Sequence, residues 1–218
     1  MLKTCSYLLV VLCLVTGVCR AAPVYDNTSV DTFNSVMFST GYVQLGDQVQ
    51  LAAPSHLASL ETQFFNLGDE TAFDATLSFY RTGTLTQIGS SFTVTGLLIG
   101  AFESLNVVFS NLGGLEVPAD VIVMLLIGNL SGNGDLGLNL FDGPTVGSSS
   151  NQSYFANAGA GAGLEEVSTL LDVDNVYFQI SAVSTPTQDV PEPSTIWLVL
   201  ALMPGLVCLR QRQVARRA

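Results

Sequence analysis

The chain has 218 residues, a formal net charge of −11 and a mean hydropathy of +0.45. Its basic residues gather at the two ends, so residues 22–190 hold only Arg81 against seventeen acids, a net charge of −16. A segment this acidic repels nucleic acid and anionic membranes, so we expect no nucleic-acid partner and no contact of this segment with an anionic membrane surface. The same segment holds no cysteine, which excludes a disulfide, a thiol nucleophile and a cysteine-ligated metal, and it must therefore depend on a hydrophobic core.

The first element is a predicted secretory signal peptide over residues 1–21. Lys3 precedes an apolar run over residues 7–15, and small residues at Ala21 and Ala22 fit cleavage between them. The run is too short to span a bilayer comfortably. Cys19 leaves a lipidated cysteine open as an alternative, although the residues before it fit such a signal poorly.

The middle of the chain is dominated by alternation of apolar and polar residues, which predicts half-buried β-strands. The apolar members of five such runs are Val43, Leu45, Val49 and Leu51; Phe73, Ala75, Leu77 and Phe79; Leu105, Val107 and Phe109; Leu136, Leu138 and Leu140; and Val176, Phe178 and Ile180. In residues 121–130 apolar residues occupy both odd and even positions, which predicts a central strand covered on both faces.

Turn-forming clusters separate these runs, and they read LGDQ, NLGDE, RTGT, NLGG, SGNGD and FDGP. Eight or nine short strands at these spacings, without alternating helices, predict an all-β domain over residues 22–183. We expect a single, jelly-roll-like β-sandwich.

The chain ends in a linker and an apolar tail. Residues 184–194 are rich in Thr and Pro and are expected to be extended. Residues 195–209 are a predicted transmembrane helix, whose uncharged stretch from Ile196 to Leu209 covers about 21 Å against a hydrocarbon core of about 30 Å. Four arginines follow within residues 210–218, and the positive-inside rule places this tail in the cytoplasm.

This tail resembles the PEP-CTERM sorting signal of Gram-negative bacteria, which is also labelled an ice-binding-protein C-terminal domain. The resemblance rests on Val190-Pro191-Glu192-Pro193-Ser194, the short apolar segment after it and the terminal arginines. It implies an exosortase as partner, with Pro191, Glu192 and Pro193 as the recognised motif. In this comparison Ile196 and Leu209 bound the membrane anchor, and the stop-transfer residues are Arg210, Arg212, Arg216 and Arg217. An ordinary tail anchor is the alternative, but such anchors run nearer 20 apolar residues.

Catalytic chemistry has little support in the sequence. His56 is the sole histidine, and no GxSxG motif accompanies it. Adjacent acids occur at Asp69-Glu70 and Glu165-Glu166, but neighbouring side chains on a strand point to opposite faces. We therefore expect no catalytic residues, no enzyme activity and no cofactor, although acids from different strands could still pair.

Calcium is the metal that the residue types fit best, because Asp, Asn and carbonyl oxygens are its ligands. The candidates lie in two turn-like stretches, Asn133 and Asp135 in the first and Asp172, Asp174 and Asn175 in the second. Ordinary turn chemistry explains the same residues, so the expected metal site is none.

The leading hypothesis is an exported, non-catalytic protein of the cell surface or extracellular matrix. It would be held transiently in the inner membrane, processed by an exosortase, and serve as a structural or adhesive component of exopolysaccharide. The alternatives are a carbohydrate-binding module that uses aromatics such as Tyr80, Tyr154 or Phe155 as a stacking platform, and a glycan-active enzyme.

Overall fold

The computed structural model describes residues 21–38, 42–149, 153–157, 163–168 and 175–183. The chain divides between Val183 and Ser184 into two compact units, and every described residue belongs to the first. The described residues contain strands and no α-helix, which confirms the all-β prediction. The predicted signal peptide up to residue 20 and the predicted helix over 195–209 lie outside the described residues.

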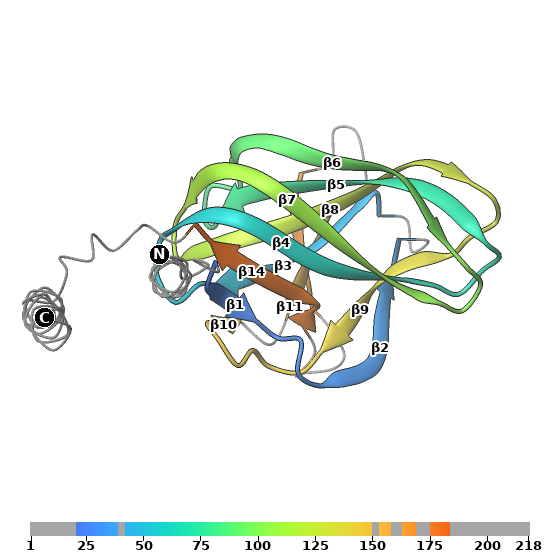
Figure 1. Ribbon diagram of the computed structural model, residues 1–218, viewed down its shortest axis with the longest axis horizontal. Helices are drawn as coiled ribbons and strands as arrows, with labels where there is room; N and C mark the ends of the chain where they lie inside the picture. The colour runs from blue at the N-terminus through green and yellow to red at the C-terminus, as the bar shows by residue number, and fades with distance from the viewer. Residues whose placement is uncertain (1–20, 39–41, 150–152, 158–162, 169–174, 184–218) are drawn as a thin grey trace, which may run out of the picture. The chain divides into compact units, whose positions relative to one another are not determined.

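The strands form two antiparallel sheets, which Figure 1 shows as two layers. Sheet A contains β1 (Pro23–Asp26), β14 (Phe178–Ala182), β4 (Ser55–Asn66), β9 (Leu136–Phe141), β13 (Asn175–Val176), β2 (Asp31–Met37) and β7 (Ser104–Val117). Sheet B contains β12 (Glu165–Ser168), β11 (Ser153–Asn157), β3 (Gln44–Gln50), β8 (Asp120–Ser131), β5 (Thr71–Arg81), β6 (Gln87–Ile99) and β10 (Ser148–Ser149). The strands are more numerous and partly longer than the eight or nine short ones expected.

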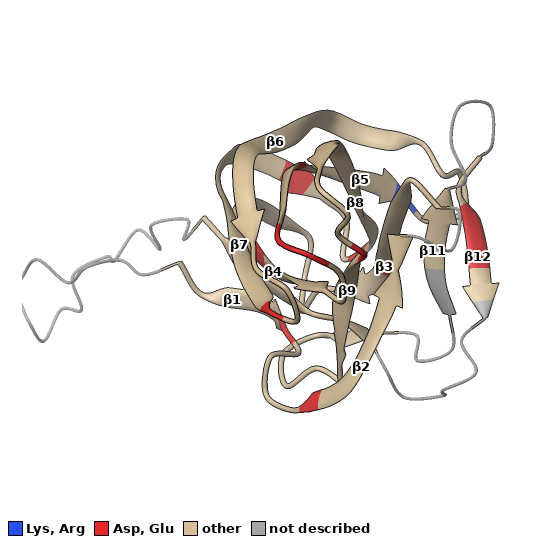
Figure 2. Ribbon diagram, turned by 90° about the vertical axis from the view of Figure 1, so that its right-hand side faces the viewer, with Lys and Arg blue, Asp and Glu red and all other residues tan. Residues whose placement is uncertain are grey.

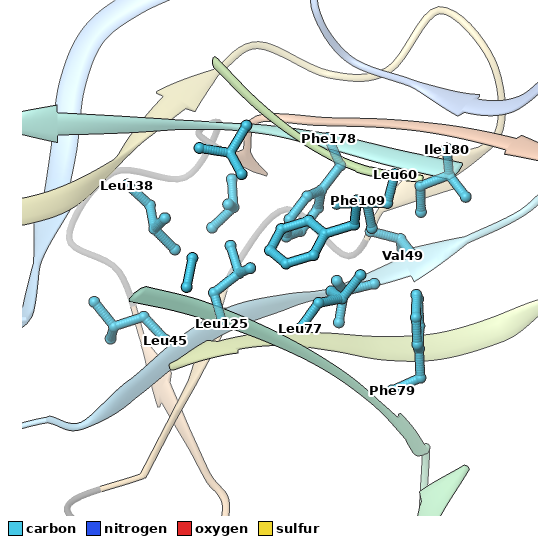
Figure 3. Close-up of a cluster of buried hydrophobic side chains, with 14 of the residues drawn as sticks. Leu45, Val49, Leu60, Leu77, Phe79, Phe109, Leu125, Leu138, Phe178 and Ile180 are labelled. Carbon is cyan, nitrogen blue, oxygen red and sulfur yellow. The ribbon is translucent and has the colours of Figure 1, made fainter. Parts of the chain in front are cut away.

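One hydrophobic core fills the space between the sheets. Figure 3 shows side chains of both sheets pointing toward one another, among them Leu60, Phe109 and Phe178 from sheet A and Leu77 and Leu125 from sheet B. Apart from Val43, which is exposed, and Leu105, which is half-buried, every apolar residue of the five alternating runs is buried. The period of two therefore identified the core face of each strand correctly.

The doubly apolar stretch over residues 121–130 lies in β8, a central strand of sheet B between β3 and β5. Val121, Val123 and Leu125 face the core, while Ile122 and Met124 are equally buried on the outer face of the sheet. Phe155 covers the latter two from β11. The prediction of a central strand covered on both faces is confirmed for residues 121–125, whereas residues 126–128 are half-buried and Asn129 and Leu130 are exposed.

Two of the expected turns are strand segments instead. LGDQ (45–48) lies inside β3, where Gly46 allows β3 to approach Met124 of β8 closely. NLGG (111–114) lies inside β7 as an irregularity, with Asn111, Gly113 and Gly114 at positive φ. Gly and Asn permit this left-handed backbone inside a strand as readily as in a turn, so their presence alone did not mark the end of a strand.

Sheet A divides on one side of β4. β9 pairs with the end of β4 and then with β2, whereas β14 pairs with the beginning of β4 and then with β1. Asn27, which is fully buried, fills the gap between the two branches. Its amide donates to the Val176 carbonyl at 2.9 Å and its oxygen accepts the Phe178 N–H at 2.8 Å. This side chain replaces the strand partner that the backbone lacks there.

The two ends of the described domain meet at the edge of sheet A. β1 pairs with β14, and the Ala182 N–H donates to the Ala22 carbonyl at 3.1 Å. The Val183 N–H then donates to the His56 carbonyl at 2.7 Å. The residues that follow the predicted export signal and precede the predicted linker are therefore neighbours.

Candidate functional site

The outer face of sheet A carries polar side chains that form two neighbouring hydrogen-bonded groups, one around Glu61 and one that joins Asp26 to Gln179. Figure 1 shows two strands of this sheet, β4 and β14, passing in front of β3 of sheet B. Residues alternate between the two faces of a strand, so one set of polar side chains of β4, β7, β9 and β14 projects away from the core, whereas Thr62 and Asn66 of β4 are buried. The residues that we call the polar face are Asp26, Glu61, Gln63, Ser104, Asn106, Asn139, Tyr177 and Gln179.

Glu61 lies at the centre of the polar face. One oxygen of its carboxylate accepts hydrogen bonds from the Asn106 amide at 2.8 Å and from the Tyr177 hydroxyl at 3.1 Å. Asn106 in turn accepts a hydrogen bond from the Gln63 amide at 2.7 Å. These bonds join β7, β4 and the segment before β14, so each amide has a fixed orientation.

Asn139 extends the network to β9. Its amide donates to the Gln63 side-chain oxygen at 2.6 Å and to the Ser104 hydroxyl at 2.9 Å. Asn139 is buried, whereas Ser104 and Asn106 are exposed and Gln63 is half-buried. Asn139 therefore orients its neighbours, and they are the groups that a ligand could reach.

Burial and the nearby Glu61 carboxylate raise the pKa of the Tyr177 phenol to about 12. The phenol therefore keeps its proton at neutral pH and acts as a donor to Glu61. Its ring packs edge-on against Phe141 of β9, with ring centroids 4.7 Å apart and planes at 75°. This is a favoured geometry for two aromatic rings, and it holds Tyr177 in place.

Asp26 and Glu61 lie on either side of Gln179, because β14 separates β1 from β4. Asp26 accepts the Gln179 amide at 3.0 Å and both the backbone N–H and the hydroxyl of Thr28, at 3.0 and 2.8 Å. Although partial burial acts to raise it, these hydrogen bonds keep the pKa of Asp26 below its ordinary value. A general acid needs a raised pKa, so Asp26 is suited to accepting hydrogen bonds and not to proton donation.

A second polar region lies at the end of the molecule that Figure 2 faces, where acidic segments occupy several turns. Buried Asn66 joins these turns. Its amide donates to the carbonyls of Asp69 and Gly100 at 2.7 and 3.1 Å, and its oxygen accepts the N–H groups of Gly68 and Asp135 at 3.0 and 3.1 Å. The acids there stand in turns that one structural asparagine organises.

The calcium candidates that the structure describes do not form a ligand set. Asn133 is exposed in the β8–β9 turn, while Asp172 and Asp174 lie outside the described residues and Asn175 is buried in β13. One oxygen of Asp135 is buried and has no hydrogen-bond partner among the described residues. Across the described ranges, no group of three or more His, Cys, Asp or Glu residues could hold a metal ion.

A hollow of about 370 Å³ lies beside Asp135. Its lining is largely apolar and includes Phe38, Tyr42 and Leu130, with Asn129 as a further polar side chain. Among the described residues that line the hollow, Asp135 is the one acid or base. The described lining of the hollow therefore lacks the pair of carboxylates that glycoside hydrolysis requires.

The remaining candidate residues are dispersed. His56 is exposed near the start of β4, with its Nδ1 3.1 Å from the Gly114 carbonyl oxygen. The exposed pair Asp69 and Glu70 lies in the β4–β5 turn, whereas Glu165 and Glu166 lie on β12 and not in a loop. No shared cleft joins these three positions in the part of the chain that the structure describes.

The expected aromatic platform is wrong for Phe155. This side chain is buried against Ile122 and Met124 on the outer face of sheet B, and Tyr80 packs half-buried against the same cluster. The side chain of Tyr154 is outside the described residues. Among the described side chains, the aromatic ones that stand free in solvent are Phe33 and Phe102.

The predicted targeting residues fall almost wholly outside the described residues. Ala21 and Ala22 are described and exposed at the beginning of the domain. The sorting motif, the anchor ends and the four arginines, all within residues 191–217, lie beyond the last described residue, Val183. Within the described ranges no helix has the length and hydropathy that a bilayer crossing requires.

One acid is buried in the core. Asp47 of β3 accepts the Gln48 N–H at 2.7 Å and the Val176 N–H at 3.1 Å, and thereby links the two sheets. Burial raises its pKa to about 8 in spite of these two donors. Burial and the nearby Asp47 also raise the pKa of Tyr25, which is itself fully buried.

The polar face is not among the sites predicted from the sequence, although the alternation that marks its outward-facing residues is present. Asn106 and Asn139 lie between the apolar members of two alternating runs, and Glu61 and Gln63 alternate in the same way with Leu60, Thr62 and Phe64. The alternation shows which residues face outward. It does not show that these particular strands are neighbours.

Comparison of the chain with protein-family models, with curated proteins and with solved structures gives no match.

Proposed function

We propose that this chain is an exported, non-catalytic protein of the cell surface or extracellular matrix, sorted through a C-terminal PEP-CTERM signal. The observation that supports the proposal best is the meeting of the domain's two ends. Ala22 and Ala182 are hydrogen-bonded neighbours at one edge of sheet A, and the described strands all lie between them. Cleavage after Ala21 and cleavage in the linker would each leave this set of strands complete.

In this proposal the signal peptide directs the chain out of the cytoplasm. The apolar segment from Ile196 to Leu209 holds it transiently in the inner membrane, with the terminal arginines on the cytoplasmic side. An exosortase recognises Pro191, Glu192 and Pro193 and removes the tail. The released domain has a structural or adhesive role in exopolysaccharide.

The jelly-roll-like description of the sandwich is part of the proposal. It is supported by consecutive strands that alternate between the sheets, at β3–β4, β4–β5, β6–β7, β7–β8 and β8–β9. Such domains expose a broad sheet face to solvent, which suits binding to extended partners better than it suits enclosure of a small substrate.

Mass spectrometry of the mature protein from its host tests the sorting proposal. We expect an N-terminus at Ala22 and a C-terminus near Pro191–Ser194. A mature chain that ends at Ala218 would refute processing by an exosortase. Substitution of Glu192 by Ala should retain the tail, whereas Glu61→Ala, in the folded domain, should be processed normally.

Carbohydrate binding is the second candidate, and the polar face is the observation that favours it. Side-chain amides, hydroxyls and carboxylates fixed by mutual hydrogen bonds are the groups that bind sugar hydroxyls. A glycan-active enzyme is less well supported, since Asp26 is held by three donors and its pKa is lowered.

A further inference from the structure

Two phenylalanines stand almost free in solvent with unfavourable backbones. Phe33 is 92% exposed at φ 59°, and Phe102 is 72% exposed at φ 57°. The left-handed region is rare for bulky residues, and exposure forfeits the hydrophobic stabilisation of a Phe side chain. The Phe33 backbone is held there by Asp31, whose carboxylate accepts its N–H at 2.7 Å. An exposed Phe side chain on a backbone at positive φ is unfavourable for folding in two ways. Its occurrence at both positions points to a role outside folding.

Both phenylalanines lie on segments that adjoin strands of the polar face. Phe33 is in the irregular part of β2, between the residues that pair with Phe141 and Leu140 of β9. Phe141 packs against Tyr177 of the polar face. Phe102 is in the β6–β7 turn, two residues before Ser104, whose hydroxyl accepts a hydrogen bond from Asn139. β9 therefore runs between the two, with Asn139 toward Phe102 and Phe141 toward Phe33.

We propose that the polar face and these two phenylalanines together bind a neutral polysaccharide. The apolar faces of sugar rings pack on Phe33 and Phe102, and the hydroxyls between them bond to Gln63, Asn106 and Ser104. This inference rests on the proposed function, because it specifies the matrix component to which the exported domain adheres.

The charge of the face selects an uncharged partner. Asp26 and Glu61 belong to it, and the one described Lys or Arg, Arg81, is at the end of β5 in sheet B. Uronate or sulfate groups on a polysaccharide would be repelled. Neutral sugars present hydroxyls that both donate and accept, which matches amides, hydroxyls and carboxylates on the same surface.

Native gels that contain a soluble polysaccharide test the proposal with the full-length chain in mild detergent. The probes are hydroxyethylcellulose, laminarin and galactomannan as neutral chains and alginate as an anionic one. We expect at least one neutral polysaccharide to slow the protein and alginate to leave its mobility unchanged. The variants Phe33→Asn, Phe102→Asn and Asn106→Ala should each weaken the retardation by about fivefold or more.

The structure supplies matched controls. Leu85→Asn changes another partly exposed apolar residue at positive φ, but in the β5–β6 turn of sheet B, and Thr93→Ala removes an exposed polar side chain from β6. Both should bind as the unaltered protein does. Because Asn tolerates the left-handed region, the two Phe→Asn variants should unfold at the same urea concentration as the unaltered chain or a higher one.

Failure of every neutral polysaccharide to retard the protein would overturn the inference, as would equal retardation of all variants or stronger binding to alginate. None of these results would affect the sorting proposal, which depends on the mature termini. Conversely, a mature chain that retains Ala218 would refute sorting and leave the binding face intact.

Discussion

At the scale of single residues, Asp47 is the least expected feature of the domain. It occupies a core-facing position of β3 between Leu45 and Val49, where alternation alone calls for an apolar side chain. Its carboxyl group accepts the N–H of Val176 in the opposite sheet, so it links the two layers. Removal from water disfavours the charged form, and the pKa of Asp47 rises to about 8.

This shift predicts how stability depends on pH. The unfolded chain loses the Asp47 proton near pH 4, whereas the folded protein keeps it up to about pH 8. The contribution of Asp47 to the free energy of unfolding should therefore be fully present below about pH 4 and fall as pH rises to about 8, by at most about 1.4 kcal/mol per pH unit. Asp26 has a lowered pKa, so its contribution to stability is lost only as pH falls below this window.

Asp47→Asn should remove most of this slope, because Asn does not titrate. Urea unfolding at several pH values between about 5 and 8.5 measures it. Asp120→Asn, a half-buried acid that accepts the Gln48 amide at 2.7 Å, is the control and should retain the slope. An unchanged slope in Asp47→Asn would show that Asp47 is ionised throughout this range.

At the scale of elements, the contact between β3 and β8 depends on a glycine. A Cβ atom at Gly46 would meet the Val123 carbonyl and Met124 of the neighbouring strand. β3 also pairs with β11, and this pairing positions the Phe155 side chain over Met124 on the outer face of sheet B. The requirement at Gly46 is for space, since its φ is not in the left-handed region.

Gly46→Ala should therefore lower the free energy of unfolding by about 1–3 kcal/mol, the usual cost of overpacking. Gly128→Ala is a matched control on β8, where a Cβ would have no atom within 4 Å. It should leave the urea midpoint unchanged or raise it slightly, because Ala restricts the unfolded chain. Equal destabilisation by both variants would contradict the steric explanation.

At the scale of the whole molecule, β14 closes the fold. It lies between β1 and β4, and Phe178 and Ile180 are fully buried in the common core. Phe178 is some 150 residues from Asn27 in sequence, yet its N–H is bonded to the Asn27 side chain. The first and last strands of the domain thus stabilise one another.

Truncation tests this closure. A chain of residues 22–183 should unfold in urea at the same midpoint as residues 22–218 when both are measured in the same mild detergent, since the second unit begins at Ser184. A chain that stops at Tyr177 loses two core side chains, each worth about 1.5–3 kcal/mol, and the pairing of β1. It should show no cooperative transition, and a normal transition would contradict the role assigned to β14.

Much of the fold was predictable from the sequence. Period-two alternation identified core residues in all five runs, and the apolar run over 121–130 identified β8 as a central strand, which is covered on both faces over residues 121–125. Turn chemistry was less informative. LGDQ and NLGG contain turn-forming residues but lie within β3 and β7, where Gly46 provides room and Gly113 and Gly114 provide an irregularity.

The sequence by itself determined which side chains point inward and outward, because alternation is a local property of the extended backbone. It also provides the predictions of export, linker and sorting signal, which concern residues other than the described domain. Only the tertiary structure decided which outward residues meet. Glu61, Asn106, Asn139 and Tyr177 are far apart in the chain and become one network through strand pairing, which depends on long-range contacts that no local pattern encodes.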